Sequence, residues 1–375
     1  MNTFKTPSYI YTGENIISTF DFSAYGKKAF IVTDNYFKEH IDFLFDRLKE
    51  QDISYKLFTD IAQEPTDTIV YAALKEFKKE ECEFIIAIGG GSVIDTAKLM
   101  AVIKEDETVG SLFPASIDRE HLPTIAIPTT AGTGSEVTQF TIISDTTTDT
   151  KLLLKGPAFL PTVALVDYTL SSSMPKSLTA ATGLDAFTHA IEAYTSKKAQ
   201  PLSDIFAVSA LKRIIKFLPV AYSDGQDSEA RKQMSLAALE AGIAFNNASV
   251  TIVHGMSRPL GALFHIAHGI SNAMLLEKCM RYVSPEARSR FASLAKELNL
   301  KGSNEEELVE ELMNVITFLC NHCEIPSLKE YGVDMEKYEK VIDKMADDAI
   351  ASGSPGNCIK DISKEDVIKI YRSYL

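Results

Sequence analysis

Cysteine is scarce in this chain of 375 residues, which has five scattered cysteines: Cys82, Cys279, Cys320, Cys323 and Cys358. An odd, dispersed set in a long chain is not a disulfide framework. Cys320 and Cys323 form a C-x-x-C pair, a spacing found in redox and zinc sites, but no second pair accompanies it. Because the pair lies in an apolar, helix-like run, we expect buried, reduced thiols.

Long apolar runs and excess positive charge are also missing. No stretch of 18 or more apolar residues occurs, so we expect no transmembrane helix, and residues 1–7 lack the apolar core of a signal peptide. The formal net charge is −13, which argues against a nucleic-acid partner because phosphates require a basic surface. These absences predict a cytoplasmic enzyme without a membrane or nucleic-acid partner.

The pattern of predicted elements changes near the middle of the chain, and two domains suit its length. Residues 1–174 alternate β-rich runs with amphipathic segments, which predicts an α/β dinucleotide-binding domain with a parallel sheet. Residues 175–375 carry mainly helical patterns and predict an all-helical domain, with the boundary near Ser171–Pro175. The expected strands are 29–33, 84–88, 124–128 and 163–166, and the expected helices lie near 36–50, 66–80 and 92–104.

A glycine-rich turn follows the predicted strand 84–88. It reads Gly89-Gly90-Gly91-Ser92, and a predicted helix begins at once, with Ser92 and Asp95 spaced as a capping box. Glycines permit close backbone approach, and the free N–H groups and dipole of a helix start attract phosphate. A tight turn without a ligand is the alternative. The motif is not G-x-G-x-x-G, so we predict a Rossmann-like rather than a standard Rossmann domain.

Two further features lie at the ends of predicted strands. The loop 128–136, which includes Thr129, Thr130, Thr133 and Ser135, is rich in hydroxyl groups suited to phosphate, ribose or carboxamide, although it could be a solvated loop. Asp34 follows strand 29–33, where an acidic group can bind ribose hydroxyls and repel a 2′-phosphate. Capping of helix 36–50 is an equally good explanation of Asp34.

Asp185 and His189 are four residues apart in a predicted helix, so their Cβ atoms lie about 5–6 Å apart on one face. Such a pair can bind a metal, or it can simply face water. His254 and His268 follow in a segment rich in histidine. In one straight helix they would be about 21 Å apart, so a shared metal requires a break, which Pro259, Gly261 and Gly269 permit.

Together the Gly89–Ser92 turn, the loop 129–136, the stretch 183–194 and the segment 254–269 resemble the iron-containing (group III) alcohol dehydrogenase family. The resemblance runs over nearly the whole chain. It implies that Asp185, His189, His254 and His268 bind Fe²⁺ or Zn²⁺, and that an Asp at position 34 favours NAD over NADP. It also implies cofactor contacts from Gly90, Ser92, Thr129, Thr130, Ser135 and Lys151, although Lys151 could equally face water.

The chemistry implied by the resemblance is hydride transfer between nicotinamide and a small primary alcohol or aldehyde, with the metal polarising the substrate oxygen. We place cofactor binding at Asp34, Gly89, Gly90, Gly91, Ser92, Asp95, Thr129, Thr130, Thr133, Ser135 and Lys151, and catalysis at the four candidate ligands with Arg258. Arg258 stands where many family members have histidine. It cannot shuttle a proton, so it either anchors a substrate or cofactor anion or forms a surface or subunit contact. His265 is a candidate for the pocket wall.

Other functions remain open. Within the same superfamily the chain could be a hydroxyacid–oxoacid transhydrogenase or a polyol dehydrogenase. A catalytically silent nucleotide-binding sensor or structural protein is the alternative from another class. The resemblance also implies a homo-oligomer, such as a dimer, and the β-like segment Tyr9–Tyr11 is a candidate contact.

Overall fold

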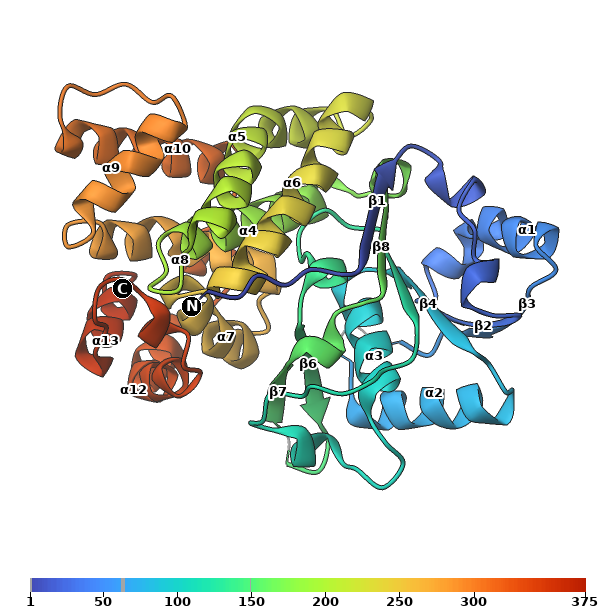
Figure 1. Cartoon of the computed structure of the whole chain (residues 1–375). Coiled ribbons are helices and arrows are strands. Elements are labelled where there is room, and N and C mark those ends of the chain that lie inside the picture. The colour runs from blue at the N-terminus through green and yellow to red at the C-terminus, as the bar shows by residue number, and fades with distance from the viewer. Residues whose placement is uncertain (1, 62–64, 149) are drawn as a thin grey trace. The chain divides into compact units, whose positions relative to one another are not determined.

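The computed structural model describes residues 2–61, 65–148 and 150–375 (Figure 1). The chain forms two compact units, one of residues 5–172 and the other of residues 1–4 with 173–375. The first is an α/β unit and the second is helical, which confirms the predicted fold class.

A six-stranded sheet in which every strand pair is parallel forms the centre of the α/β unit. Its order across the sheet is β1 (Tyr9–Gly13), β8 (Val163–Asp167), β5 (Thr124–Pro128), β4 (Phe84–Gly89), β2 (Lys28–Val32) and β3 (Ser54–Phe58). The sequence predicted the four strands with the most apolar runs. It missed β3 as a strand, because Ser54 and Lys56 interrupt its apolar pattern. A separate antiparallel pair consists of β6 (Phe140–Asp145) and β7 (Thr150–Lys155).

Helices cover both faces of the sheet, and side chains that point alternately to the two faces along each strand pack against them. Phe30 and Val32 of β2 pack into one buried cluster with α2 (Asp67–Lys79) and α3 (Gly91–Val102). Ala29 and Ile31 point the other way, into a cluster with α1 (Asp42–Glu50). Successive strand residues face opposite sides, so a sheet buried on both faces requires the continuous apolar runs seen here.

The carboxyl ends of β2, β4 and β5 form one edge of this sheet. Val32 pairs with Ala87, and Gly89 pairs with Pro128, so the residues that follow these three strands lie at the same end of the sheet. The chain runs from β2 outward to β3 and then returns to the other side of β2 as β4. Such a reversal of strand order is where open α/β sheets bind ligands.

The helical unit is built around α4 (Lys176–Tyr194), which is buried over most of its length and packs against α5, α6 and α8. Among the described residues, the other helices of this unit are α5 (Pro201–Ser223), α6 (Ser228–Ala248), α7 (Ile252–Phe264), α8 (His268–Val283), α9 (Arg288–Glu297), α10 (Glu305–His322), α11 (Leu328–Tyr331), α12 (Met335–Ala351) and α13 (Lys364–Arg372).

Two local predictions were wrong. The segment expected as one helix over 36–50 is a 3-10 turn, Phe37–His40, followed by α1, because the backbone departs from helical geometry at Ile41. The capping box of Ser92 and Asp95 does not form. Helix α3 begins at Gly91 and its N-cap is Gly90, so Ser92 already lies inside the first turn.

No single described helix is long and apolar enough to cross a membrane. The pair α6 and α7 reaches that length and composition together, but a bend of 106° separates them. All five cysteines are free, and Cys82, Cys279, Cys323 and Cys358 are buried.

Candidate functional site

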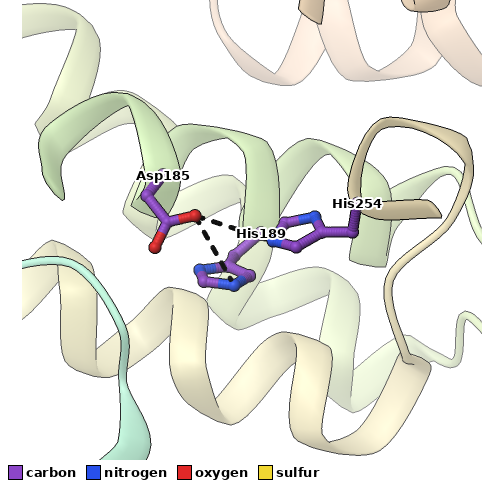
Figure 2. Close-up of side chains that lie close together, drawn as sticks. All are labelled: Asp185, His189 and His254. Carbon is purple, nitrogen blue, oxygen red and sulfur yellow. Dashed lines mark ion pairs between the residues drawn. The ribbon is translucent and has the colours of Figure 1, made fainter. Parts of the chain in front are cut away.

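Three side chains from distant parts of the sequence converge in the helical unit. Asp185 and His189 lie one turn apart on α4, and His254 comes from the first turn of α7 (Figure 2). All three are buried, and their candidate ligand atoms lie within 4.8 Å of one another. The Oδ1 atom of Asp185 lies 3.9 Å from Nε2 of His189 and 3.6 Å from Nε2 of His254.

His268 completes a set of four. Its Nε2 atom lies 3.6 Å from Oδ1 of Asp185, and its side chain is 45% exposed. The break that brings His268 back toward His254 lies at His265, which has a left-handed backbone with φ of 53°. It does not lie at Pro259, which is inside α7. Gly269 then allows α8 to approach α4, because a Cβ there would lie 2.2 Å from the carbonyl oxygen of Ala181. The predicted break between His254 and His268 is therefore present, and it separates α7 from α8.

Neighbouring groups fix the orientation of the two buried imidazoles. The ring of His189 stacks between Phe245 and His254, with centroids 4.2 and 4.5 Å away. His254 contacts Glu192, whose Oε2 atom lies 2.6 Å from Nδ1 of the imidazole. The Nε2 atom of His254 therefore faces Asp185. A carboxylate on the far nitrogen of a histidine is a common support for metal ligation.

The cluster holds an amide that the sequence reasoning missed. The Nδ2 atom of Asn272 lies 2.7 Å from Oδ1 of Asp185, and 3.2 and 3.3 Å from Nε2 of His254 and His268. Its Oδ1 atom is buried and has no hydrogen-bond partner in the described structure. An orphaned acceptor beside a group of ligand atoms is a reason to expect a bound ion or water.

The protonation of the cluster follows from burial and close charges. Burial opposes ionisation of Asp185, but His189, His268 and His254 outweigh it and lower the pKa of the carboxyl. Burial lowers the pKa of His189 to about 3, so this imidazole is neutral at neutral pH. Burial also disfavours charge on His254, but hydrogen bonds to Asp185 and Glu192 raise its pKa. A cation at this cluster competes with the proton on His254.

The donor set fits a divalent transition metal. It offers one carboxylate oxygen and three imidazole nitrogens, which suit Fe or Zn. Two ligands about 2.1 Å from a tetrahedral ion lie about 3.4 Å apart, so the observed separations of 3.6 to 3.9 Å require only a small contraction.

The predicted nucleotide-binding residues lie at the sheet edge of the α/β unit. Gly90 follows β4 directly and is the N-cap of α3, and no side chain caps that helix. A Cβ on Gly90 would meet only Thr130, at 3.7 Å, so the space in front of the turn is open. Asp34 follows β2, and its Oδ1 atom accepts a hydrogen bond of 2.7 Å from the backbone N–H of Phe37. Asp34 thus stabilises the 3-10 turn and leaves Oδ2 for another partner.

Two predicted residues, Asp95 and Ser135, take part in a buried network beneath the turn. The carboxylate of Asp95 accepts from the Ser135 hydroxyl at 2.5 Å and from the N–H of Ile142 at 2.9 Å. Buried Lys98, which the sequence reasoning missed, donates to Ser135, to Thr138 and to the carbonyl of Phe140. Burial lowers the pKa of Lys98 to about 8. The network fastens α3 to the loop 129–140.

Among the remaining predicted residues, Thr129 and Thr133 lie beside the glycine turn, whereas Lys151 lies elsewhere in the α/β unit. Thr129 is buried, Thr133 accepts a hydrogen bond from the N–H of Ser135, and Lys151 is exposed on β7. His265 is exposed at the end of α7. Arg258 lies on α7 one turn after His254 and donates to the Ser354 hydroxyl at 3.0 Å. Spacing places Glu192 and Asn272 near the cluster, because they follow His189 and His268 by three and four residues, but it does not show which side chains they contact.

The chain belongs to the iron-containing alcohol dehydrogenase family. Residues 7–168 match the iron-containing alcohol dehydrogenase domain, and residues 179–375 match the C-terminal domain of the same family. The family is therefore confirmed for both units, and the protein is an oxidoreductase.

Among its relatives is an NADPH-dependent butanol dehydrogenase of Clostridium saccharobutylicum, 35% identical over 99% of this chain and 97% of the relative. The crystal structure of a 1,3-propanediol oxidoreductase superposes with a TM-score of 0.95 at 32% identity, covering 100% of both chains. The crystal structure of a sulfoacetaldehyde reductase from Bifidobacterium kashiwanohense, in complex with NAD⁺, superposes with a TM-score of 0.89 at 28% identity. The match covers 100% of this chain and 98% of the other.

Proposed function

We propose that this protein is an NAD-dependent, divalent-metal-dependent alcohol dehydrogenase or aldehyde reductase acting on a small primary alcohol or aldehyde. The observation that carries the proposal is the convergence of three imidazole Nε2 atoms on one carboxylate oxygen of Asp185. The family supports redox chemistry with a nicotinamide, and the cluster supports a metal ion.

The candidate ligands of the ion, Fe²⁺ or Zn²⁺, are Asp185, His189, His254 and His268. When bound, such an ion supplies a Lewis acid that polarises the oxygen of a carbonyl or favours an alkoxide. Asp185 contributes the one formal negative charge among the candidate ligands. Because the imidazoles are neutral, they would leave the rest of the ion's positive charge to act on the substrate oxygen. Glu192 holds the proton of His254 on Nδ1, which directs the lone pair of Nε2 toward the cluster.

Preference for NAD rests on Asp34. A carboxylate at the end of β2 can accept from the ribose hydroxyls and repels a 2′-phosphate. Ser92, Thr129 and Thr130 lie at the carboxyl ends of β4 and β5, and with the open glycine turn they supply donors for phosphate and ribose.

A homodimer is a further part of the proposal. Strand β1 pairs with β8 on one side, and no other described strand pairs with it. Tyr9 and Tyr11 on this edge strand are 56% and 43% exposed. An unpaired edge with exposed aromatic side chains can pair with a second copy.

The test is turnover of NADH and of NADPH against a panel of short aldehydes, with protein purified anaerobically and then depleted of metal. We expect NADH oxidation that is lost on chelation and restored by Fe²⁺ or Zn²⁺. Hydride exchange between two organic substrates without turnover of added NADH would identify a transhydrogenase instead. No activity with either cofactor, with and without metal, would contradict the proposal.

A further inference from the structure

Arg258 is a cation without a counter-ion in the described structure. It lies on α7 one turn after His254, so their Cβ atoms are about 5–6 Å apart on the same face of the helix. Its side chain is partly exposed, it forms no ion pair, and its single hydrogen bond goes from Nη1 to the Ser354 hydroxyl. Burial lowers the pKa of the guanidinium, but arginine remains protonated in proteins.

Comparison with the other arginines shows that the lack of a carboxylate partner at Arg258 is unusual. Arg47, Arg119, Arg213, Arg281, Arg288 and Arg290 each pair with a carboxylate. Buried Arg231 has no carboxylate, but it donates three hydrogen bonds to oxygens of the protein. Arg372 is exposed near the C-terminal end of the sequence. In an acidic chain, a partly buried arginine with one neutral partner is an exception that requires an explanation.

Nearby acidic groups do not supply the missing charge. Glu192 is the carboxylate whose charge acts on Arg258, but its oxygens already accept from Thr251, Val253 and His254. Asp185 accepts from Asn272 and faces the imidazoles. The two acidic groups near Arg258 are therefore already engaged with other donors.

The guanidinium is held in place. A Cβ on Gly255 would lie 2.7 Å from Cδ of Pro355, so the segment that carries Ser354 packs directly against α7. Ser354 is buried and anchors one nitrogen of Arg258. Since a guanidinium has five N–H donors in a planar fork, most of them remain for a planar or tetrahedral anion.

We propose that Arg258 binds an anionic group of the substrate, so that the preferred substrate is a short aldehyde or alcohol carrying a carboxylate or a similar oxyanion. This inference rests on the proposed function, because the reacting oxygen is directed to the Asp185 cluster. The short separation of His254 and Arg258 on α7 places the anion within a few carbon atoms of the reacting carbon.

The test compares 4-oxobutanoate with butanal, which have the same chain length and differ in charge. We expect the wild-type protein to prefer 4-oxobutanoate in kcat/KM. In Arg258→Met this preference falls by about 10–100-fold, the range for a lost charge-assisted hydrogen-bond pair, because kcat/KM falls more for 4-oxobutanoate than for butanal. Arg258→Lys restores part of the preference. Arg372→Met removes a charge elsewhere and serves as the matched control.

A binding measurement separates failure of this inference from failure of the proposed function. Calorimetric titration of the metal-loaded protein with succinate, which does not react, should give a Kd that rises by a similar factor in Arg258→Met. If neither aldehyde is reduced, the proposed function fails and the succinate titration still decides the role of Arg258. Equal losses for both aldehydes, or a weaker NADH affinity with unchanged aldehyde preference, would overturn the inference; the second result would assign the anion to the cofactor.

Discussion

The Oε2 atom of Glu192 lies 2.6 Å from the Nδ1 atom of His254, and both residues are buried. Burial opposes the ionisation of Glu192, but the bond from His254 and those from Thr251 outweigh it, so the pKa of this carboxyl is lowered. Oε1 accepts from Thr251 and from the N–H of Val253. One carboxylate on α4 thus fixes both the start of α7 and the ring of a candidate metal ligand.

Replacing Glu192 should therefore weaken metal binding without removing a ligand. In Glu192→Gln the amide places N–H groups against protein donors, and His254 loses its orienting charge. We expect a loss of metal affinity of about 10–100-fold, the range for such supporting groups, measured by competition with a chelator of known affinity. Glu240→Gln on α6 is the matched control, because Glu240 pairs with Arg213 outside the cluster. Equal affinities of the two variants would contradict this role.

The glycine turn after β4 offers a pair of variants that separates folding from binding. A Cβ at Gly90 meets nothing closer than 3.7 Å, so Gly90→Ala should keep the melting temperature and lose NADH affinity by filling the space beside the turn. A Cβ at Gly89 lies 2.6 Å from Cγ2 of Val93, so Gly89→Ala should lower the melting temperature. Calorimetric NADH binding and thermal unfolding are the two measurements. Unchanged NADH affinity in Gly90→Ala would remove the turn from the cofactor site.

Cofactor choice should depend on the charge at position 34. Asparagine retains the oxygen that accepts from the N–H of Phe37, so Asp34→Asn should fold normally. Loss of the charge removes the repulsion of a 2′-phosphate, and we expect kcat/KM for NADPH relative to NADH to rise by roughly tenfold, or about 1.4 kcal/mol. If the ratio stays constant, Asp34 only stabilises its turn.

The pH dependence of stability should include a contribution from Glu136, which lies next to Ser135 and is buried. Burial raises its pKa from 4.5 to about 7. Between these values the folded protein retains a proton that the unfolded chain has released, so the free energy of unfolding falls as pH rises through this window. Glu136→Gln cannot lose a proton. Its stability relative to the wild type should therefore increase with pH by up to about 1.4 kcal/mol per unit and level off above pH 7.

Melting temperatures between pH 5 and 8 provide the measurement for Glu136→Gln. Glu107→Gln is the control, because the pKa of Glu107 is shifted in the direction opposite to that of Glu136. The side-chain hydrogen bond from Arg119 lowers the pKa of Glu107, so its effect on stability is already complete above its unfolded pKa and stays constant over this range. Parallel pH profiles for the two variants would show that Glu136 does not titrate in the window.

Local spacing explains what the sequence could predict about the site. Asp185 and His189 share a helix face by geometry alone, and the distance between His254 and His268 required a break. The position of the break was not predictable from breaker residues. Pro259 lies within α7, and the chain turns at His265, where packing of Gly269 against α4 determines the path.

Tertiary contacts explain what the sequence could not predict. Glu192 supports His254 only because α7 begins beside α4, and Lys98 is buried only because α3 packs against the loop that carries Ser135. The expected cap by Asp95 was wrong for the same reason, since Ser135 and Ile142 bind its carboxylate. Such roles require knowledge of which elements are neighbours, and periodicity along one segment does not contain it.

The most direct test of the central claim is the metal content of the wild-type protein and of Asp185→Ala after anaerobic reconstitution with Fe²⁺, measured by elemental analysis. His265→Ala, which removes an exposed histidine outside the cluster, is the control. We expect a single iron per chain in the wild type and the control, and almost none in Asp185→Ala. A wild-type protein that binds no Fe²⁺ or Zn²⁺, or an Asp185→Ala variant that retains its full metal content, would contradict it.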